Sequence, residues 1–166
     1  DRFWRATSAA RRGHIRLSDI KPDKAREAVR STVVRILVVD DDQTMRMICR
    51  RFFQRSGLAA GVDVVEAESG EEAIEILGRQ QFDCVLSDYR MGAVSGLDVL
   101  AYAAEHRPKA VRIMMSGYAD PALVSRAISE ARVHEFIEKP MTTGDLETKL
   151  MELLVERYLK KLPSSG

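Results

Sequence analysis

Five short apolar runs, each followed by a segment of helical period, constrain the fold of this chain more than any other feature. The runs are rich in β-branched residues and nearly continuous, as is typical of strands covered on both faces. They lie at Val34–Val39, Val62–Glu66, Cys84–Ser87, Ala110–Met115 and Glu135–Glu138. The helical segments are predicted at roughly 43–56, 70–79, 96–106, 120–130 and 143–161.

Strands that alternate with helices in this way predict βα units and a parallel sheet. The expected fold class is therefore α/β, with a five-stranded doubly wound parallel sheet flanked by five helices. Signals at the helix starts agree with it. Ser69 with Glu72 and Thr142 with Asp145 have capping-box spacing, and Asp120-Pro121 has the composition of an N-cap followed by the first helical position.

The apolar positions of the first predicted helix repeat three to four residues apart, so this helix is expected to bury one side. That side is predicted to contain Ile48, Cys49, Phe52 and Phe53.

Residues 1–32 differ in composition from the rest of the chain, with many arginines and few large apolar residues. We interpret 1–32 as a basic N-terminal arm, linker or tag remnant that is solvated, although Pro22 is suited to the first turn of a short helix. A docking or dimerising arm is the alternative. Residues 33–162 are expected to form the folded domain, and 163–166 a short tail.

Polar groups of a distinctive kind follow the predicted strands. Asp40-Asp41-Asp42, Ser87-Asp88, Ser116-Gly117 and Lys139-Pro140 each stand at a carboxyl end, which is the edge where doubly wound sheets place their sites. Converging carboxylates raise one another's pKa unless a cation lies among them, and Mg²⁺ prefers such oxygen ligands. A lysine can offset the carboxylates or meet a phosphoryl group, while a hydroxyl and a glycine N–H donate well to phosphate.

Taken in order, these groups resemble the response-regulator receiver domains of two-component signalling. The resemblance runs from about Val34 to Leu154, so the folded domain at 33–162 is identified as a receiver-like domain. It rests on the motifs Ile36–Asp42 with Arg46, Ser69–Ala73, Ser87–Met91 with Gly96-Leu97, Met115–Asp120 and Phe136–Pro140.

The resemblance implies a role for each acidic residue. Asp88 is expected to be the phosphoacceptor. Asp40 and Asp41, together with Asp88 and the backbone carbonyl of Arg90, are expected to hold Mg²⁺, with Asp41 the closer ligand of the pair. Asp42 is expected to lie past the site.

The remaining roles concern the phosphoryl group and the switch. Lys139 and Ser116 are expected to bind the phosphoryl group beside the backbone N–H of Gly117. Ser116 and Phe136 are the expected switch pair, in which the aromatic ring moves inward after phosphorylation. Pro140 matches a position that carries a cis peptide bond in the family.

Two positions depart from the family pattern. Gly92 stands where many relatives have proline, and Ser95 where many have aspartate. Neither position belongs to the expected set of acids, metal ligands and lysine.

The implied function is phosphorelay signal transduction in bacteria. The domain would take its phosphoryl group from a sensor histidine kinase or phosphotransfer protein, and would act on a downstream protein target or on an output domain absent from this chain. It would catalyse only its own phosphorylation and dephosphorylation. Whether it is a stand-alone receiver or part of a longer regulator, and whether it forms a homodimer, stays open.

The sequence disfavours three alternative functions. A metal-dependent phosphotransfer or cleavage enzyme also gathers acids at strand ends, but none of His14, His106 and His134 stands where an acid or base is needed, and no phosphate-binding G-x-x-x-x-G-K-[ST] motif occurs. An inactive adaptor would not need to keep every reactive group. DNA binding through the arginine-rich arm lacks aromatic interleaving or a helix-turn-helix pattern.

Composition bears on the compartment and the partners. The formal net charge is +1, so no strong overall field favours nucleic acid or an anionic membrane. Cys49 and Cys84 fall inside apolar segments, and two thiols do not form a disulfide framework. No apolar run approaches the length of a membrane span. These observations favour a cytoplasmic protein.

Overall fold

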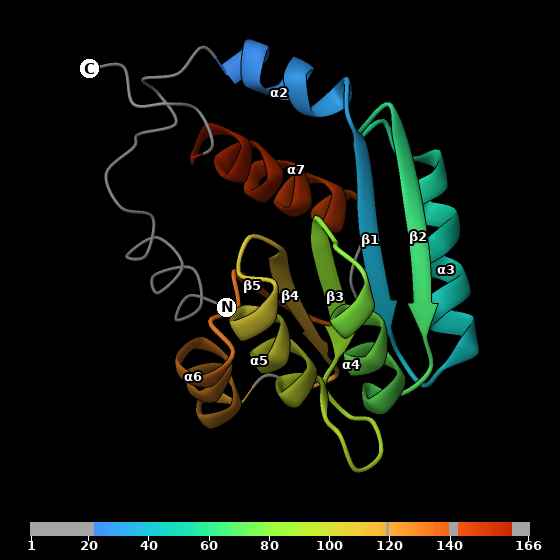
Figure 1. Cartoon of the computed structure of the whole chain (residues 1–166), viewed down its shortest axis with the longest axis vertical. Helices are drawn as coiled ribbons and strands as arrows, with labels where there is room; N and C mark the ends of the chain where they lie inside the picture. Colours follow the sequence, from blue (N-terminus) through green and yellow to red (C-terminus); the bar gives the residue numbers. More distant parts are fainter. Residues whose placement is uncertain (1–21, 119, 140–142, 161–166) are drawn as a thin grey trace.

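The computed structural model describes residues 22–118, 120–139 and 143–160. Its centre is one sheet of five parallel strands in the order β2-β1-β3-β4-β5 (Figure 1). The strands are β1 Val33–Val39, β2 Gly61–Ala67, β3 Cys84–Asp88, β4 Val111–Ser116 and β5 Glu135–Glu138. The predicted strand runs and the α/β fold class are confirmed.

Six helices are present in the described part of the chain. They are α2 Pro22–Arg30, α3 Gln43–Arg55, α4 Gly70–Arg79, α5 Gly96–His106, α6 Pro121–Glu130 and α7 Thr143–Lys160. None of them is long and apolar enough to cross a bilayer.

Two separate core clusters cover the two faces of the sheet. One cluster packs α4, α5 and α6 against the sheet through residues such as Leu77, Leu100 and Leu123. The other packs α2, α3 and α7 against the opposite face, with Phe53 and Leu150 among its buried members. Because both faces are covered, every residue of β3 and β4 is buried, which explains the continuous apolar runs.

The predicted helix caps are confirmed in part. Asp120 accepts a hydrogen bond from Leu123 N at 2.8 Å, with Pro121 as the first helical residue. Ser69 accepts from Glu72 N at 3.1 Å, but the Glu72 carboxylate accepts from Glu68 N and so reaches one residue further back than a capping box requires. Of the predicted pair Thr142 and Asp145, Thr142 lies outside the described residues.

A capping box that the sequence analysis did not predict occurs at Ser95. Its side chain accepts from Asp98 N at 3.3 Å, and the Asp98 carboxylate accepts from Ser95 N at 2.9 Å. Ser95 therefore fixes the start of α5, at a position where it departs from the family pattern.

Residues 22–30 correct the expectation of a solvated arm. They form the helix predicted to start near Pro22, but Ala25 and Val29 are buried and belong to the same core cluster as Leu154 of α7. Only two residues separate α2 from β1, and Ala60 N donates to the carbonyl of Thr32 at 2.8 Å. This short connection holds α2 beside α7, as Figure 1 shows.

The expected buried side of α3 is also corrected at one position. Cys49 and Phe53 are buried, four residues apart, whereas Ile48 is 45% exposed and Met47 is 42% exposed. A helix turns about 100° per residue, so the residues directly before Cys49 lie beyond the edge of the stripe that meets the sheet.

Truncation of Val29 tests whether α2 belongs to the folded core. We expect Val29→Ala to lower the free energy of unfolding by about 1–3 kcal/mol, because it removes buried apolar surface and leaves a cavity between α2 and α7. Arg26→Ala, on the exposed side of the same helix, should change it by less than about 0.5 kcal/mol. Urea unfolding measures both, and equal stability of the two variants would contradict the packing of α2.

Candidate active site

The side chains predicted to be functional meet at the carboxyl edge of the sheet. Strand order reverses between β1 and β3, so these two strands are neighbours although they are not consecutive in the chain. Asp40 directly follows β1, Asp88 ends β3 and Ser116 ends β4, while Lys139 directly follows β5. A doubly wound sheet opens its binding crevice at this reversal.

Lys139 joins the two buried carboxylates of the site. Its Nζ lies 3.1 Å from Asp40 Oδ2 and 3.1 Å from Asp88 Oδ1. Asp40 is 1% exposed and Asp88 is 8% exposed. The ammonium group therefore compensates two carboxylates that would otherwise repel each other in a poorly solvated place.

The ionisation of these groups reflects the same contacts. Burial raises the pKa of Asp88 above its ordinary value, and the hydrogen bond and charge of Lys139 oppose that rise. Burial acts to lower the pKa of Lys139, but its hydrogen bonds to Asp88 and Asp40 outweigh this effect, so its pKa lies above the ordinary value. Lys139 is therefore a fixed positive charge at neutral pH.

Asp41 completes a group of three acids. One carboxylate oxygen each from Asp40, Asp41 and Asp88 lies within 4.8 Å of the others, with Asp41 exposed to solvent. Three oxygen donors at this spacing, one of them open to water, fit a hard divalent cation such as Mg²⁺.

Asp42 lies outside this group of three acids, as expected from the sequence. Its side chain accepts a hydrogen bond from Thr44 N at 2.9 Å and caps α3. Its own N–H donates to Asp40 Oδ1 at 2.9 Å. Asp42 thus positions Asp40 and starts the helix that follows.

The hydroxyl of Ser116 is engaged by the loop that follows it. Ser116 Oγ donates to the carbonyl of Tyr118 at 2.9 Å and accepts from Tyr118 N at 3.2 Å. Gly117 lies exposed between them, and a Cβ added to it would meet nothing within 4 Å. The hydroxyl must therefore leave the Tyr118 carbonyl before it can donate to another acceptor.

Other predicted residues lie around this centre. Arg90 is exposed in the loop after β3. Phe136 is 5% exposed and belongs to the same core cluster as Leu123 and Val124 of α6. The ring of Phe136 is thus buried in this cluster, and its inward movement after phosphorylation stays a prediction. Pro140 lies outside the described residues.

Gly96 is a structural requirement of the site that the sequence analysis did not recognise. A Cβ on Gly96 would lie 1.9 Å from the carbonyl oxygen of Asp88 and 3.0 Å from Ser87 Oγ. Gly96 N donates to the carbonyl of Tyr89 at 2.9 Å. A glycine as the first residue of a predicted helix indicates a close approach by another part of the backbone, here that of Asp88, because glycine has no side chain to prevent it.

A family comparison agrees with this geometry. Residues 36–151 match the model of the response regulator receiver domain. The chain belongs to the response-regulator receiver family. Its place in phosphorelay signalling follows from that membership and from the relatives described next.

Chemotaxis protein CheY-3 of Vibrio cholerae is 31% identical to this receiver over 75% of the chain and 94% of its own length. A cyclic di-GMP phosphodiesterase of Thermotoga maritima is 30% identical over 76% of this chain, which spans only 35% of that enzyme. Response regulator TrrA of Thermotoga maritima, solved in complex with Mg²⁺-BeF, has a TM-score of 0.62 and 29% identity, over 72% of this receiver and 98% of that structure.

Substitution of Gly96 tests whether the contact between α5 and the Asp88 backbone is required. In this receiver, Gly96→Ala should lower the free energy of unfolding by about 1–3 kcal/mol, because the added methyl group clashes with backbone atoms that cannot move away. The melting temperature should fall by several degrees.

Gly92→Ala is the matched control in the same loop region. Nothing lies within 4 Å of a Cβ at Gly92, so its melting temperature should stay close to that of the unmodified chain. A Gly96→Ala variant as stable as this control would contradict the close approach.

Proposed function

We propose that this receiver domain takes a phosphoryl group onto the Asp88 carboxylate and uses the loop after β4 to transmit the change. The observation that carries this proposal is the position of the Lys139 ammonium, 3.1 Å from both Asp88 and Asp40. A buried acid beside a fixed cation, at the reversal of a parallel sheet, is suited to hold a group that brings further negative charge.

The reaction is a displacement at phosphorus. An oxygen of Asp88 forms the new P–O bond, and the leaving group departs with the electron pair of the bond that breaks. Asp88 becomes a mixed anhydride, and hydrolysis by water later returns the carboxylate and inorganic phosphate. Lys139 remains protonated throughout and pairs with the phosphoryl oxygens.

Asp40, Asp41 and Asp88 would hold Mg²⁺, with the carbonyl of Arg90 as a further ligand. The spacing of the three carboxylates supports this assignment. When bound, the ion would offset the carboxylate charges and polarise the phosphate oxygens. Asp41 is the exposed acid of the group, so it is the one that an ion from solvent reaches first.

Ser116 is proposed to transmit the change. Its hydroxyl would give up the Tyr118 carbonyl and donate to a phosphoryl oxygen, beside the N–H of Gly117. Breaking the two contacts between Ser116 and Tyr118 frees the loop that leads into α6. We place the first movement in this loop, and Phe136, which is buried in the same core cluster as Leu123 of α6, would respond to it as the second member of the switch.

The proposed donor is a sensor histidine kinase or a phosphotransfer protein, and the proposed recipient is a downstream protein or an output domain outside this chain. The domain would act only on its own phosphorylation state.

The two histidines that the structure describes do not lie near the phosphoacceptor. His106 ends α5 and His134 precedes β5, so both lie at the opposite edge of the sheet from Asp88, while His14 lies outside the described residues. We propose that the receiver unit covers 33–162, that 1–32 form an N-terminal extension whose helix α2 packs into the core of that unit, and that 163–166 form a tail.

Replacement of Asp88 tests the acceptor. Incubation with acetyl phosphate and Mg²⁺ should add one phosphoryl group to the chain, and Asp88→Asn should abolish this, because an amide is not a nucleophile. Asp63→Asn, an exposed acid on β2, should label as the unmodified chain does. Intact-protein mass spectrometry measures the added phosphoryl group, and full labelling of Asp88→Asn would rule out the assignment.

A second pair of variants tests the metal ligands. Asp41→Asn should weaken Mg²⁺ binding on the order of tenfold or more, because it removes one charged ligand. Asp42→Asn should leave the affinity within about twofold, because asparagine caps a helix as well as aspartate does. Titration calorimetry separates the two, and a larger loss in Asp42→Asn would show that the ligand register is displaced by one residue.

A further inference from the structure

A cavity lies at the edge of the sheet opposite to Asp88. Its volume is about 260 Å³, and it opens where β4 and β5 begin and the last turns of α7 pass over them. The lining residues are Pro108, Lys109, Val111, His134, Leu153, Glu156, Arg157 and Lys160. Since β4 runs from Val111 to Ser116, the cavity is separated from the phosphoacceptor edge by roughly 15 Å of strand.

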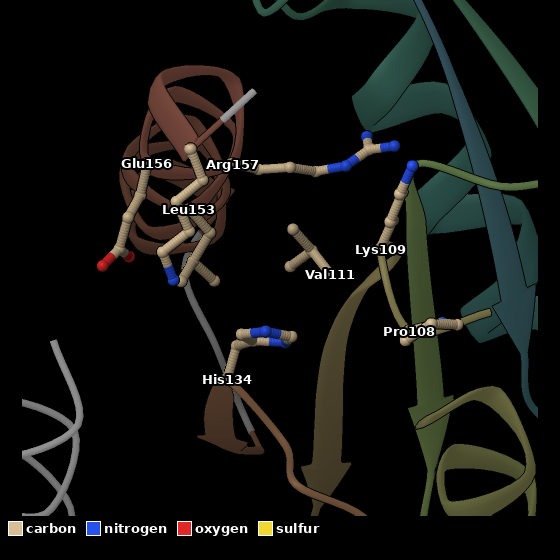
Figure 2. A pocket seen from close by; sticks show the side chains of 8 residues that line it. Pro108, Lys109, Val111, His134, Leu153, Glu156 and Arg157 are labelled. Atoms are coloured by element: carbon tan, nitrogen blue, oxygen red, sulfur yellow. The ribbon is translucent and has the colours of Figure 1, made fainter. Parts of the chain in front are cut away.

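The floor of the cavity is apolar and its walls are basic. Val111 and Leu153 supply apolar surface, whereas Lys109, Arg157 and Lys160 carry positive charge. Figure 2 shows Arg157 extending over Val111 toward Lys109, while Glu156 points away from Val111. Glu156, the one acidic residue of the lining, therefore points away from the side of Val111 where Arg157 and Lys109 lie.

The positive charge of the walls is only partly compensated. Arg157 donates to Asp83 Oδ1 at 2.5 Å through one terminal nitrogen, but its Nε is buried and has no hydrogen-bond partner. Among the described residues, neither Lys109 nor Lys160 forms an ion pair. Lys109 and Lys160 are exposed, so an anion that enters the cavity can reach their ammonium groups.

His134 adds a polar group of defined orientation. Its Nδ1 lies 2.9 Å from the backbone N–H of Arg112 and accepts a hydrogen bond from it. In the neutral ring the proton is then on Nε2, so the other ring nitrogen is a donor. Figure 2 places this ring on the side of Val111 opposite to Arg157.

One wall of the cavity is built from residues outside the family match. That match ends at residue 151, whereas Leu153, Glu156, Arg157 and Lys160 belong to the part of α7 that continues beyond it. This part of α7 is supported by α2, whose Ala25 and Val29 share a core cluster with Leu154 and Val155. This wall of the cavity therefore lies beyond the residues that match the family model.

We propose that the cavity binds a small organic anion, namely a phosphonate, phosphate ester or carboxylate that carries one apolar ring. Lys109, Lys160 and Arg157 would bind the anionic group, and Val111 and Leu153 would contact the ring. A volume of about 260 Å³ lies just below the usual range of ligand pockets, roughly 300–1,000 Å³, which limits the ligand to about this size.

The test uses phenylphosphonate, which has the proposed anion and ring but no phosphoryl group that can be transferred. Amide NMR spectra of the full chain are recorded without Mg²⁺ during titration with phenylphosphonate, inorganic phosphate or benzyl alcohol. We expect saturable shifts at Val111, His134 and Leu153 with phenylphosphonate, and binding at least about fivefold weaker for phosphate or benzyl alcohol alone.

Two double variants of equal net charge complete the test. Lys109→Gln/Lys160→Gln should weaken phenylphosphonate binding at least about fivefold, because it removes two cations next to the anion. Arg51→Gln/Arg55→Gln removes two exposed cations from α3 and should leave the affinity within about twofold. Equal affinity of the two double variants, shifts centred on Asp88, or equally tight binding of benzyl alcohol would overturn the proposal.

Discussion

The bridge between the Lys139 ammonium and the carboxylates of Asp40 and Asp88 is the interaction on which the rest of this site depends. Burial, together with the negative charge of Asp40, raises the pKa of Asp88 and so disfavours its charged form. The lysine comes from the end of β5, whereas the acids come from the ends of β1 and β3. The charges therefore compensate one another only when the whole five-stranded sheet has formed. A folded sheet and a reactive carboxylate are thus parts of one arrangement.

Rigid and movable parts of the site are supported by different kinds of contact. Asp88 is held from behind by the close approach of Gly96, and Asp40 is oriented by the backbone of Asp42 at the start of α3. Ser116 has only a local turn with Tyr118 to hold its hydroxyl. An added phosphoryl group would therefore meet an acid and a lysine held by the sheet, whereas the Ser116 hydroxyl would have to exchange only its local contacts with Tyr118. This difference gives a physical route from a local change in charge to the segment before α6.

Much of this arrangement could be predicted from the sequence, because the positions of the strands and the chemistry at their ends are local signals. The apolar runs predicted the strands, and the order of acids, hydroxyl and lysine predicted which side chains converge. Tertiary packing set the limits of prediction. The burial of Val29 depends on the two-residue connection between α2 and β1. The exposure of Ile48 depends on where α3 meets the sheet. The burial of Phe136 depends on the packing of α6. The cavity beside Arg157 joins segments far apart in the chain, which periodicity does not reveal.

The position of the phosphoryl group tests the central claim most directly. After phosphorylation with acetyl phosphate and Mg²⁺, borohydride reduces the acyl phosphate carbon to an alcohol and releases phosphate, so the acceptor aspartate becomes homoserine. Peptide mass spectrometry then locates that residue. The account predicts homoserine at Asp88 and at no other acid, with the Lys139 and Asp40 side chains unmodified. Homoserine at Asp40 or Asp41, or label that resists borohydride, would contradict it.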